Sequence, residues 1–353
     1  MPIFTLDTKK RRTQWAKEIL SIHSDDQFSV ALQSLFKIQS QSTPAICSLA
    51  KSKKDFANDW KLTPALPQKI FKTTSLLSSS QATIEFHTSG TTTGSPGIHR
   101  MRDDLLYRSA TQHGFPWKES APFSILSLHP NSQSAPHSSL SAMINHWFQL
   151  YGDSSSTHCF DNGKVNSEKL WISLQKKRTP QDNPLLIIGT AFSFVHLFED
   201  WGTDRRLKLP SDAVIMETGG YKGRSRELPK KELYHLIQNY FGVQDSQIWN
   251  EYGMCELSSQ AYAQGVNGIH QPPPWARVIM IDPRTGKEVP IGKQGIVKWL
   301  DLANVDSSVG VQTLDFAIRH PKGFQLLGRA PQTEKRGCSL TIEREIVDSS
   351  ESN

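Results

Sequence analysis

Two short, continuous apolar runs with an amphipathic segment between them limit the folds that this chain can adopt. The runs are 185–188 (LLII) and 213–216 (AVIM), and the segment 190–201 between them is apolar with a helical period. A further amphipathic helix is predicted over 228–240. Continuous apolar runs are typical of strands buried on both faces of a parallel sheet. Alternation of such strands with helices predicts an α/β fold.

The sequence on either side of this core has a different texture. Residues 1–75 contain Leu, Ile, Phe and Trp at helical spacings, and we interpret them as a helical N-terminal region. The α/β core is assigned to 76–270. From about residue 271, strand-like runs separated by turn residues predict a β-rich subdomain that continues to 345 with a C-terminal segment. Residues 346–353 are interpreted as a tail.

Local patterns predict two elements near the start of the core. A short strand is expected over 83–86, directly before a loop rich in Ser, Thr and Gly. A helix is expected over 102–111, with Asp103 or Asp104 near its start.

Composition excludes several classes of protein. The four cysteines form no CxxC pair and have no zinc-site spacing, so we expect reduced thiols. The basic run 9–12 (KKRR) has no apolar segment behind it, and the longest apolar run is too short to cross a bilayer. No aromatic residues interleave these charges, which favours a solvated N-terminal tail over a nucleic-acid contact. We therefore expect a cytoplasmic protein with no membrane span and no nucleic-acid partner.

The loop after the first predicted strand is the first candidate site. It reads FHTSGTTTGSPGIH over 86–99. Hydroxyls and bare backbone N–H groups form nests for phosphate oxygens, although a flexible spacer has a similar composition. The chain contains no Walker P-loop, no G-x-S-x-G element and no G-x-G-x-x-G fingerprint. These absences exclude the most familiar phosphate loops and the α/β-hydrolase nucleophile.

Two motifs resemble the adenylate-forming superfamily of acyl-CoA synthetases and luciferases. TSGTT at 88–92 is similar to the start of its phosphate loop, T-S-G-T-T-G-x-P-K, with Thr93 as an insertion and Gly97 where the lysine is usual. NEYGMCEL at 250–257 is similar to the Y-G-x-T-E element, with Cys255 in the position of Thr.

A narrower resemblance is to the acyl-protein synthetase (LuxE) family. It is carried by ETGGYKGRSRE at 217–227 and YGMCELSSQAY at 252–262. Further similar segments, in unbroken order over roughly 60–345, are SPGIHRMRDDLLYRSA, SSLSAM, DLANVDSS, LLGRA and RGCSL.

The resemblance implies a fold and a function. The fold is the large domain of an adenylate-forming enzyme, with stacked α/β subdomains and a smaller β-rich subdomain. A full C-terminal domain is not expected, because about two dozen residues follow Arg329. The implied reaction uses ATP and Mg²⁺ to convert a carboxylic acid, of the fatty-acid class, to acyl-AMP. The acyl group then passes to a cysteine thiol and on to a partner such as an acyl reductase. An acyl- or aryl-CoA ligase and a non-catalytic nucleotide-binding homologue are the alternatives.

The resemblance also implies ATP-binding residues. The loop residues would donate hydrogen bonds to the β- and γ-phosphates, and two glycines would form the turn beside adenine. Tyr252 would stack on the base, with a core tyrosine as the alternative. Asp315 would accept both ribose hydroxyls, with Leu314 departing from the acid that the family carries before it, and Arg329 would contact ribose or phosphate. The full set is Thr88, Ser89, Gly90, Thr91, Thr92, Gly219, Gly220, Tyr252, Asp315 and Arg329.

Four further residues complete the implied site. Glu256 is the implied Mg²⁺ ligand, because a hard carboxylate oxygen together with phosphate oxygens suits that ion. His99 and Lys222 are implied donors near the phosphates, although a structural histidine and a solvated lysine fit the spacing too. Cys338, in RGCSL, is the implied acyl acceptor, and the basic residues just upstream favour its thiolate. An incidental cysteine is the alternative.

Overall fold

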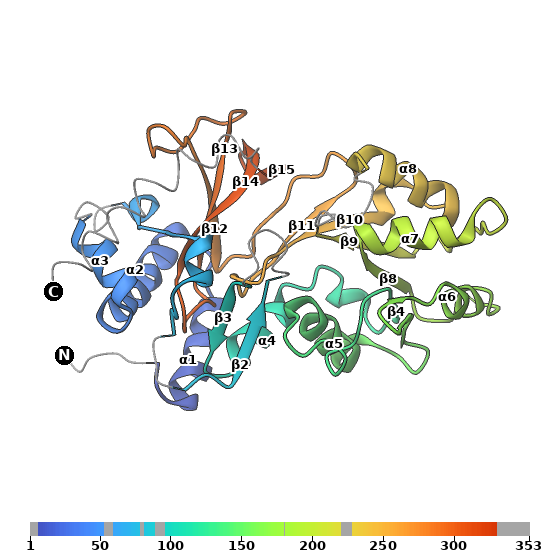
Figure 1. Ribbon diagram of the computed structural model, residues 1–353, viewed down its shortest axis with the longest axis horizontal. Helices are drawn as coiled ribbons and strands as arrows, with labels where there is room; N and C mark the ends of the chain where they lie inside the picture. The colour runs from blue at the N-terminus through green and yellow to red at the C-terminus, as the bar shows by residue number, and fades with distance from the viewer. Residues whose placement is uncertain are drawn as a thin grey trace. The chain divides into compact units, whose positions relative to one another are not determined.

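The chain forms two compact units in the computed structural model (Figure 1). The structure describes residues 6–52, 59–77, 81–88, 96–179, 181–219 and 228–329. Unit 1 comprises 1–111, 254–260 and 271–353, and unit 2 comprises 112–253 and 261–270. The segment boundaries expected from the sequence stay a prediction.

Unit 2 is built on a six-stranded sheet in the order β11-β10-β9-β8-β4-β5, in which β11 alone is antiparallel to its neighbour. The strands are β4 (Ser124–Ser127), β5 (Thr157–His158), β8 (Leu185–Thr190), β9 (Val214–Thr218), β10 (Ile248–Tyr252) and β11 (Ala261–Gln264). The strands predicted over 185–188 and 213–216 are β8 and β9. The prediction of a parallel α/β sheet is therefore confirmed.

The helices of unit 2 also follow the sequence pattern. They are α5 (Ser139–Tyr151), α6 (Ser167–Leu174), α7 (Ala191–Trp201) and α8 (Lys230–Phe241), with short 3-10 turns η4 (Lys118–Ser120) and η5 (Asp245–Gln247) and a small hairpin of β6 (Phe160–Asp161) and β7 (Lys164–Val165). The Thr190 hydroxyl caps α7 by accepting the Ser193 N–H at 3.0 Å. Gly242 ends α8 at φ +61°, a left-handed conformation that glycine adopts without strain. The helices predicted over 190–201 and 228–240 are confirmed.

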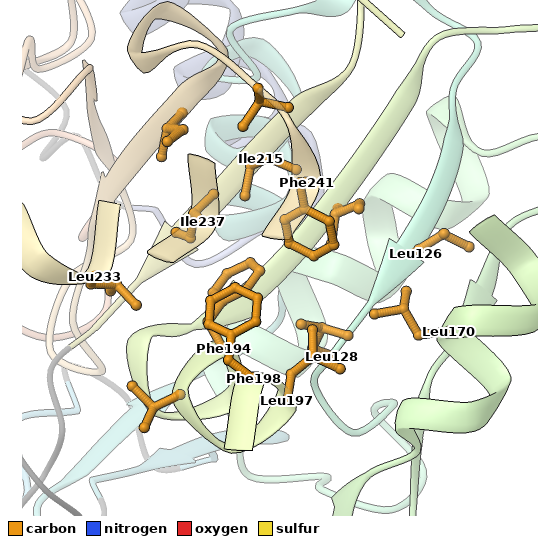
Figure 2. Packing of buried hydrophobic residues seen from close by; sticks show 14 of the residues in the cluster. Leu126, Leu128, Leu170, Phe194, Leu197, Phe198, Ile215, Leu233, Ile237 and Phe241 are labelled. Carbon is orange, nitrogen blue, oxygen red and sulfur yellow. The ribbon is translucent and has the colours of Figure 1, made fainter. Parts of the chain in front are cut away.

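The core of unit 2 lies between α6, α7, α8 and one face of the sheet (Figure 2). Phe194, Phe198 and Phe241 pack there with Ile215 of β9. The alternate strand residues Leu186, Ile188 and Met216 are fully buried as well. Because successive side chains of a strand point to opposite faces, both faces of the sheet are covered. This double burial explains why the strands are apolar throughout.

Unit 1 contains a second, mostly antiparallel sheet. Its five strands are β12 (Ala276–Ile281), β13 (Gln294–Asp301), β14 (Gly310–His320) and β15 (Gly323–Arg329), with β1 (Leu66–Pro67) parallel to β14. A separate hairpin joins β2 (Ile84–His87) to β3 (Ile98–Met101). The helical elements are α1 (Lys9–Leu20), α2 (Asp25–Ser42), α3 (Pro44–Ser52), α4 (Leu105–His113, whose end enters unit 2), η2 (Trp60–Leu62) and η3 (Gln68–Lys72). The predicted strands after residue 271 are confirmed.

One helix boundary differs from the prediction. The helix expected over 102–111 begins at Leu105. Arg102 lies outside the helix, because its N–H donates to the Asp306 carboxylate at 3.0 Å and its carbonyl accepts the Thr83 hydroxyl at 2.6 Å. Asp103 does lie at the helix start, where its Oδ1 accepts the Leu105 N–H at 3.0 Å.

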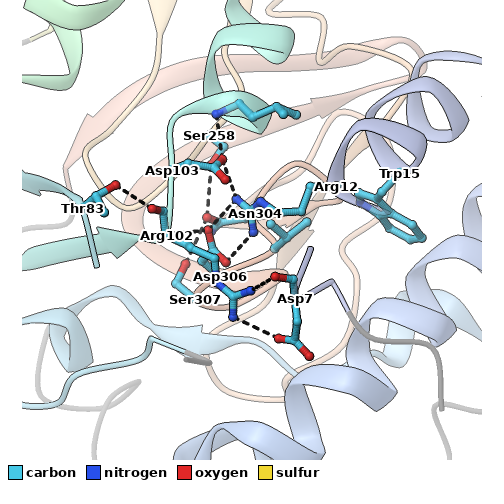
Figure 3. Close-up of polar contacts among 12 residues, drawn as sticks. Asp7, Arg12, Trp15, Thr83, Arg102, Asp103, Ser258, Asn304, Asp306 and Ser307 are labelled. Atoms are coloured by element: carbon cyan, nitrogen blue, oxygen red, sulfur yellow. Dashed lines mark hydrogen bonds and ion pairs between the residues drawn. The ribbon is translucent and has the colours of Figure 1, made fainter. Parts of the chain in front are cut away.

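The basic run at the N-terminus lies in a helix, so the interpretation as a tail was wrong, although Lys9, Lys10 and Arg11 are exposed to solvent. Residues 9–12 open helix α1, and Arg12 is 1% exposed. Its guanidinium donates two hydrogen bonds to Asp306, at 2.7 and 2.8 Å, and one to Asp103 at 3.0 Å (Figure 3). The bidentate geometry is the strong form of an Arg–carboxylate pair.

A buried carboxylate links the sheet of unit 2 to α8. Glu217 of β9 is 4% exposed and accepts hydrogen bonds from Asn250 Nδ2 at 2.6 Å and from the Tyr234 hydroxyl at 3.3 Å. Burial raises the pKa of Glu217 to about 7, although the nearby Lys230 charge and the two hydrogen bonds oppose the rise. Glu217 therefore retains its proton over a pH range in which an exposed glutamate is ionised.

This raised pKa makes stability depend on pH. A folded-state pKa above the unfolded value of 4.5 means that the native state binds more protons, so stability falls as pH rises toward about 7. Relative to Glu217→Gln, the wild-type free energy of unfolding should fall by about 3 kcal/mol between about pH 4.5 and about pH 8. Urea unfolding across this range measures the difference. Glu232→Gln, on the exposed face of the same helix, is the control. Parallel pH profiles for wild type and Glu217→Gln would contradict the account.

Candidate active site

The residues after β10 carry the candidate metal ligand, Glu256. Buried side chains hold the backbone on both sides of it, within unit 1. His99 Nδ1 lies 2.8 Å from the Cys255 carbonyl, and Asn304 Nδ2 donates to the Glu256 carbonyl at 3.0 Å. The carboxylate of Asp301 accepts the N–H groups of Ser258 and Ser259 at 3.1 and 2.8 Å. We call residues 254–260 the Glu256 segment and these three side chains its clamp.

The clamp residues come from β3 and from the end of β13. Asp301 is the last residue of β13, and Asn304 lies in the connection from β13 to β14. We call residues 301–308 the loop 301–308. All three clamp side chains are at most 1% exposed. Buried polar groups without partners are costly, and here each one meets a backbone or hydroxyl group of the Glu256 segment.

The loop 301–308 is itself fixed at several points. Asn304 Nδ2 also donates to the Ser308 carbonyl at 2.8 Å, and Gln39 Nε2 of α2 donates to the Asn304 carbonyl at 2.8 Å. Asp306 binds Arg12 of α1 (Figure 3). The loop enters β14 at Gly310, where a Cβ atom would lie 2.5 Å from the Pro64 carbonyl oxygen, so glycine is required.

The Glu256 side chain is 5% exposed and lies among charged groups. Burial raises its pKa to about 7, its own N–H and the charges of Arg329 and Lys72 lower the pKa, and the charge of Asp315 raises it. Among the described residues, no other residue donates a hydrogen bond to this carboxylate. Because burial disfavours the ionised form of this carboxylate, a bound cation would stabilise it.

Asp315 and Arg329 face each other across a strand pair. They are register partners in the β14–β15 ladder, and Arg329 Nε lies 3.6 Å from Asp315 Oδ1. The Arg329 side chain is 65% exposed, so it is accessible to a ligand. The neighbouring Leu314, which departs from the family pattern, donates its N–H to the Gln68 side chain at 3.1 Å. The structure thus brings together Glu256, Asp315 and Arg329, which the sequence had indicated from separate motifs.

The phosphate-loop motif begins at Thr88, directly after β2 of the β2–β3 hairpin. Thr88 and Gly97 continue the pairing beyond these strands, because the Thr88 N–H donates to the Gly97 carbonyl at 2.9 Å and the Gly97 N–H donates to the Thr88 hydroxyl at 2.7 Å. Ser89, Gly90, Thr91 and Thr92 lie outside the described residues. Their predicted contacts with phosphate stay a prediction.

Lys72 was not identified from the sequence. A Cβ atom built on Gly97 would lie 3.5 Å from Lys72 Cγ, and the Lys72 charge lowers the pKa of Glu256. This lysine therefore lies beside the position where the superfamily loop carries its own lysine. It belongs to no motif, so spatial proximity is its only signal.

The remaining candidates in unit 2 lie at the ends of adjacent parallel strands. Gly219 follows β9 at φ +68°, a left-handed conformation that favours glycine. Tyr252 ends β10, is 6% exposed and packs edge-on against His270, with 6.1 Å between ring centroids. Gly220 and Lys222 lie outside the described residues, and the adenine contacts stay predictions.

The last candidates for the site are His99 and the cysteines. His99 is fully buried, and its second ring nitrogen, Nε2, lies 2.9 Å from the Ser307 hydroxyl. Both ring nitrogens are therefore engaged within the protein. Its predicted role as a donor to phosphate stays a prediction. Cys47, Cys159 and Cys255 are free thiols, and Cys338 lies outside the described residues.

The carboxylate of Glu256 suits a cation that binds together with the phosphates of a substrate. No group of three or more His, Cys, Asp or Glu side chains able to hold a metal exists among the described residues. Mg²⁺ in proteins is usually held by one or two carboxylates together with substrate phosphates and water. A single buried carboxylate such as Glu256 matches that pattern and does not match a complete protein-built metal cage.

Comparison with known proteins identifies the family. The family model described as acyl-protein synthetase, LuxE, matches residues 38–347. The chain belongs to the LuxE acyl-protein synthetase family. A relative from Aliivibrio fischeri, the long-chain-fatty-acid–luciferin-component ligase, is 24% identical over 199 residues, covering 53% of this chain and 52% of the relative. The chain thus matches about half the length of that LuxE-family relative.

Two solved structures resemble the fold of this chain. An open conformation of 2-hydroxyisobutyryl-CoA ligase, in complex with 2-HIB-AMP and CoA, has a TM-score of 0.61 and 12% identity, covering 86% of this chain and 74% of the other. ATP-bound MatB from Rhodopseudomonas palustris has a TM-score of 0.50 and 14% identity, covering 72% and 48%. The predicted large-domain fold of adenylate-forming enzymes is therefore confirmed.

Among the described residues, no helix has the length and apolar character that a membrane span requires.

The clamp predicts a stability cost for Asp301→Asn. An amide in place of this buried carboxylate cannot accept all four of its hydrogen bonds, from the N–H groups of Ser258, Ser259 and Ala303 and the Ser259 hydroxyl. We expect a loss of about 2–3 kcal/mol in the free energy of unfolding, measured with denaturant. Asp282→Asn, at an exposed turn of the same unit, should cost under about 0.5 kcal/mol. Equal losses for the two variants would contradict the role assigned to Asp301.

Proposed function

We propose that this LuxE-family chain uses ATP to activate a carboxylic acid of the fatty-acid class as an acyl-adenylate. The observation that carries the proposal is the grouping of buried Glu256 with Asp315, Arg329 and Lys72. The name of the A. fischeri relative, a long-chain-fatty-acid ligase, supports the choice of acid. The ATP bound to MatB supports the choice of nucleotide.

The proposed chemistry is displacement at the α-phosphorus of ATP. A carboxylate oxygen of the acid forms the new bond to phosphorus, and the bond to pyrophosphate breaks. In such transfers a protein acts mainly by positioning and by stabilising charge. Arg329 and Lys72 supply positive charge for the phosphates, and Asp315 is an acceptor for ribose hydroxyls.

Glu256 is the residue that would hold Mg²⁺, which when bound neutralises phosphate charge. Its buried backbone clamp keeps the carboxylate in one place. Gly219 and Tyr252 keep their predicted role at the adenine.

We further propose that the acyl group passes to Cys338. The thiolate would attack the acyl carbon, forming a thioester as AMP leaves. A partner protein, such as an acyl reductase, would then take the acyl group. The support for this step is the family resemblance of the RGCSL segment.

The first step predicts exchange of labelled pyrophosphate into ATP that depends on a carboxylic acid. Over a panel of fatty and aryl acids, we expect exchange with long-chain fatty acids. Glu256→Gln should lower the exchange rate by about 100-fold or more, because the cation ligand is lost. Glu199→Gln, an exposed glutamate on α7, is the control and should exchange at the wild-type rate. Absence of exchange with every acid would overturn the proposed activity, and a fully active Glu256→Gln variant would remove Glu256 from the site.

The second step predicts a thioester on Cys338. After incubation with ATP and a radioactive fatty acid, we expect a protein label that neutral hydroxylamine removes. Cys338→Ser should lose this label and keep acid-dependent pyrophosphate exchange, because adenylation does not use the thiol. Cys47→Ser, which alters a free cysteine on α3, should keep both. A hydroxylamine-labile label on Cys338→Ser would place the acceptor elsewhere.

A further inference from the structure

His99 connects the hairpin of β2 and β3 to the residue directly before Glu256. Its Nδ1 lies 2.8 Å from the Cys255 carbonyl oxygen, and its Nε2 lies 2.9 Å from the Ser307 hydroxyl. All of these residues belong to unit 1. The ring also packs edge-on against Phe71, with 5.7 Å between centroids.

The partners define the tautomer of the ring. A carbonyl oxygen only accepts hydrogen bonds, so Nδ1 carries the proton and donates to Cys255. Burial lowers the pKa of His99, against the hydrogen bond to Cys255 and the charge of Asp306, which raise it. A neutral ring leaves Nε2 as an acceptor. The single Ser307 proton, which lies within reach of Nε2 at 2.9 Å and of Asn304 Oδ1 at 3.0 Å, therefore goes to Nε2, and Asn304 Oδ1 accepts the Ser258 hydroxyl at 3.2 Å. His99 is therefore a directional link in which each nitrogen has a different task.

The position of this link bears on Glu256. His99 holds the carbonyl of Cys255, and Asn304 holds the carbonyl of Glu256 itself at 3.0 Å. Two successive peptide groups are thus fixed around the Cα atom of Glu256, which sets the direction in which its side chain leaves the backbone. Groups that orient a ligand residue in this way affect its affinity for a metal without touching the metal.

We infer that His99 is a positioning residue, which holds the Glu256 carboxylate in its cation-binding orientation through the hydrogen bond from Nδ1 to the Cys255 carbonyl. The inference rests on the proposed function, since it gives a role to a residue that supports the proposed Mg²⁺ ligand. It assigns no direct contact between His99 and substrate.

Two amide substitutions separate the tasks of the two ring nitrogens. In His99→Asn the side-chain amide nitrogen can occupy the position of Nδ1 and still donate to Cys255. In His99→Gln the side-chain amide reaches the position of Nε2, where its oxygen can accept from the Ser307 hydroxyl, and the contact with Cys255 is lost. Both variants lose the ring and its contact with Phe71, so their packing losses are matched.

The readout is ATP binding by calorimetry, with and without Mg²⁺, which requires no turnover. We expect Mg²⁺ to increase the affinity of the wild type for ATP, and Glu256→Gln to abolish that increase. His99→Asn should keep it within about threefold, whereas His99→Gln should lose about 10- to 100-fold. Equal behaviour of the two histidine variants would overturn the inference.

A measurement on the unmodified protein guards against variants that fail to fold. With ¹⁵N-labelled histidine, the His99 Nδ1–H resonance should shift when Mg²⁺ and ATP are added together and not when ATP is added alone. An unchanged resonance under saturating Mg²⁺ and ATP would overturn the inference.

Different results would overturn the proposed function and the inference about His99. If the wild type gains no ATP affinity from Mg²⁺, the proposed metal role of Glu256 is wrong and the inference about His99 falls with it. If the wild type gains affinity and Glu256→Gln does not, but both histidine variants match the wild type, the inference alone is overturned.

Discussion

Unit 1 depends on the buried hydrogen bonds between the loop 301–308 and the Glu256 segment. Asp301 and Asn304 are at most 1% exposed, and their partners are backbone groups of residues 256–259. A buried polar group that loses its partner costs about 1–3 kcal/mol, so neither segment can move without the other. The pair of Arg12 and Asp306 extends the same constraint to helix α1. Arg12 and Asp306, which are 294 positions apart in the chain, thereby belong to one hydrogen-bonded support of the Glu256 segment.

This support holds Glu256 in a buried position that disfavours its ionised form. Burial of Glu256 raises its pKa to about 7, which means that the ionised form is disfavoured where it stands. The backbone, fixed on both sides, sets the direction in which the side chain leaves the chain. The β14–β15 ladder places Asp315 and Arg329 nearby with the same rigidity. In an enzyme of the proposed kind, such a preorganised arrangement stabilises developing charge without further rearrangement.

The sequence was informative where the signal was local. The apolar runs at 185–188 and 213–216 predicted their strands because burial on both faces leaves a continuous pattern. The motifs around Glu256, Asp315 and Arg329 indicated residues that the structure brings together. The burial of Arg12 was missed because a basic run has the same pattern on a solvated tail, and the decisive partner, Asp306, lies far along the chain. The contacts of the clamp could not be predicted from the sequence either. The segment DLANVDSS carried a family resemblance, but its contacts with the Glu256 segment arise only from tertiary packing.

The central claim, that the chain forms an acyl-adenylate, is tested most directly by following the carboxylate oxygen. A long-chain fatty acid with both carboxylate oxygens replaced by ¹⁸O is incubated with the protein, ATP and Mg²⁺, and the AMP released on transfer to a thiol is analysed by mass spectrometry. Attack of the carboxylate on the α-phosphorus leaves one acid oxygen in the new bond, and thiol attack at the acyl carbon releases that oxygen with AMP. The account predicts AMP that carries one ¹⁸O atom per turnover. Label in inorganic phosphate, or AMP without label, would contradict it.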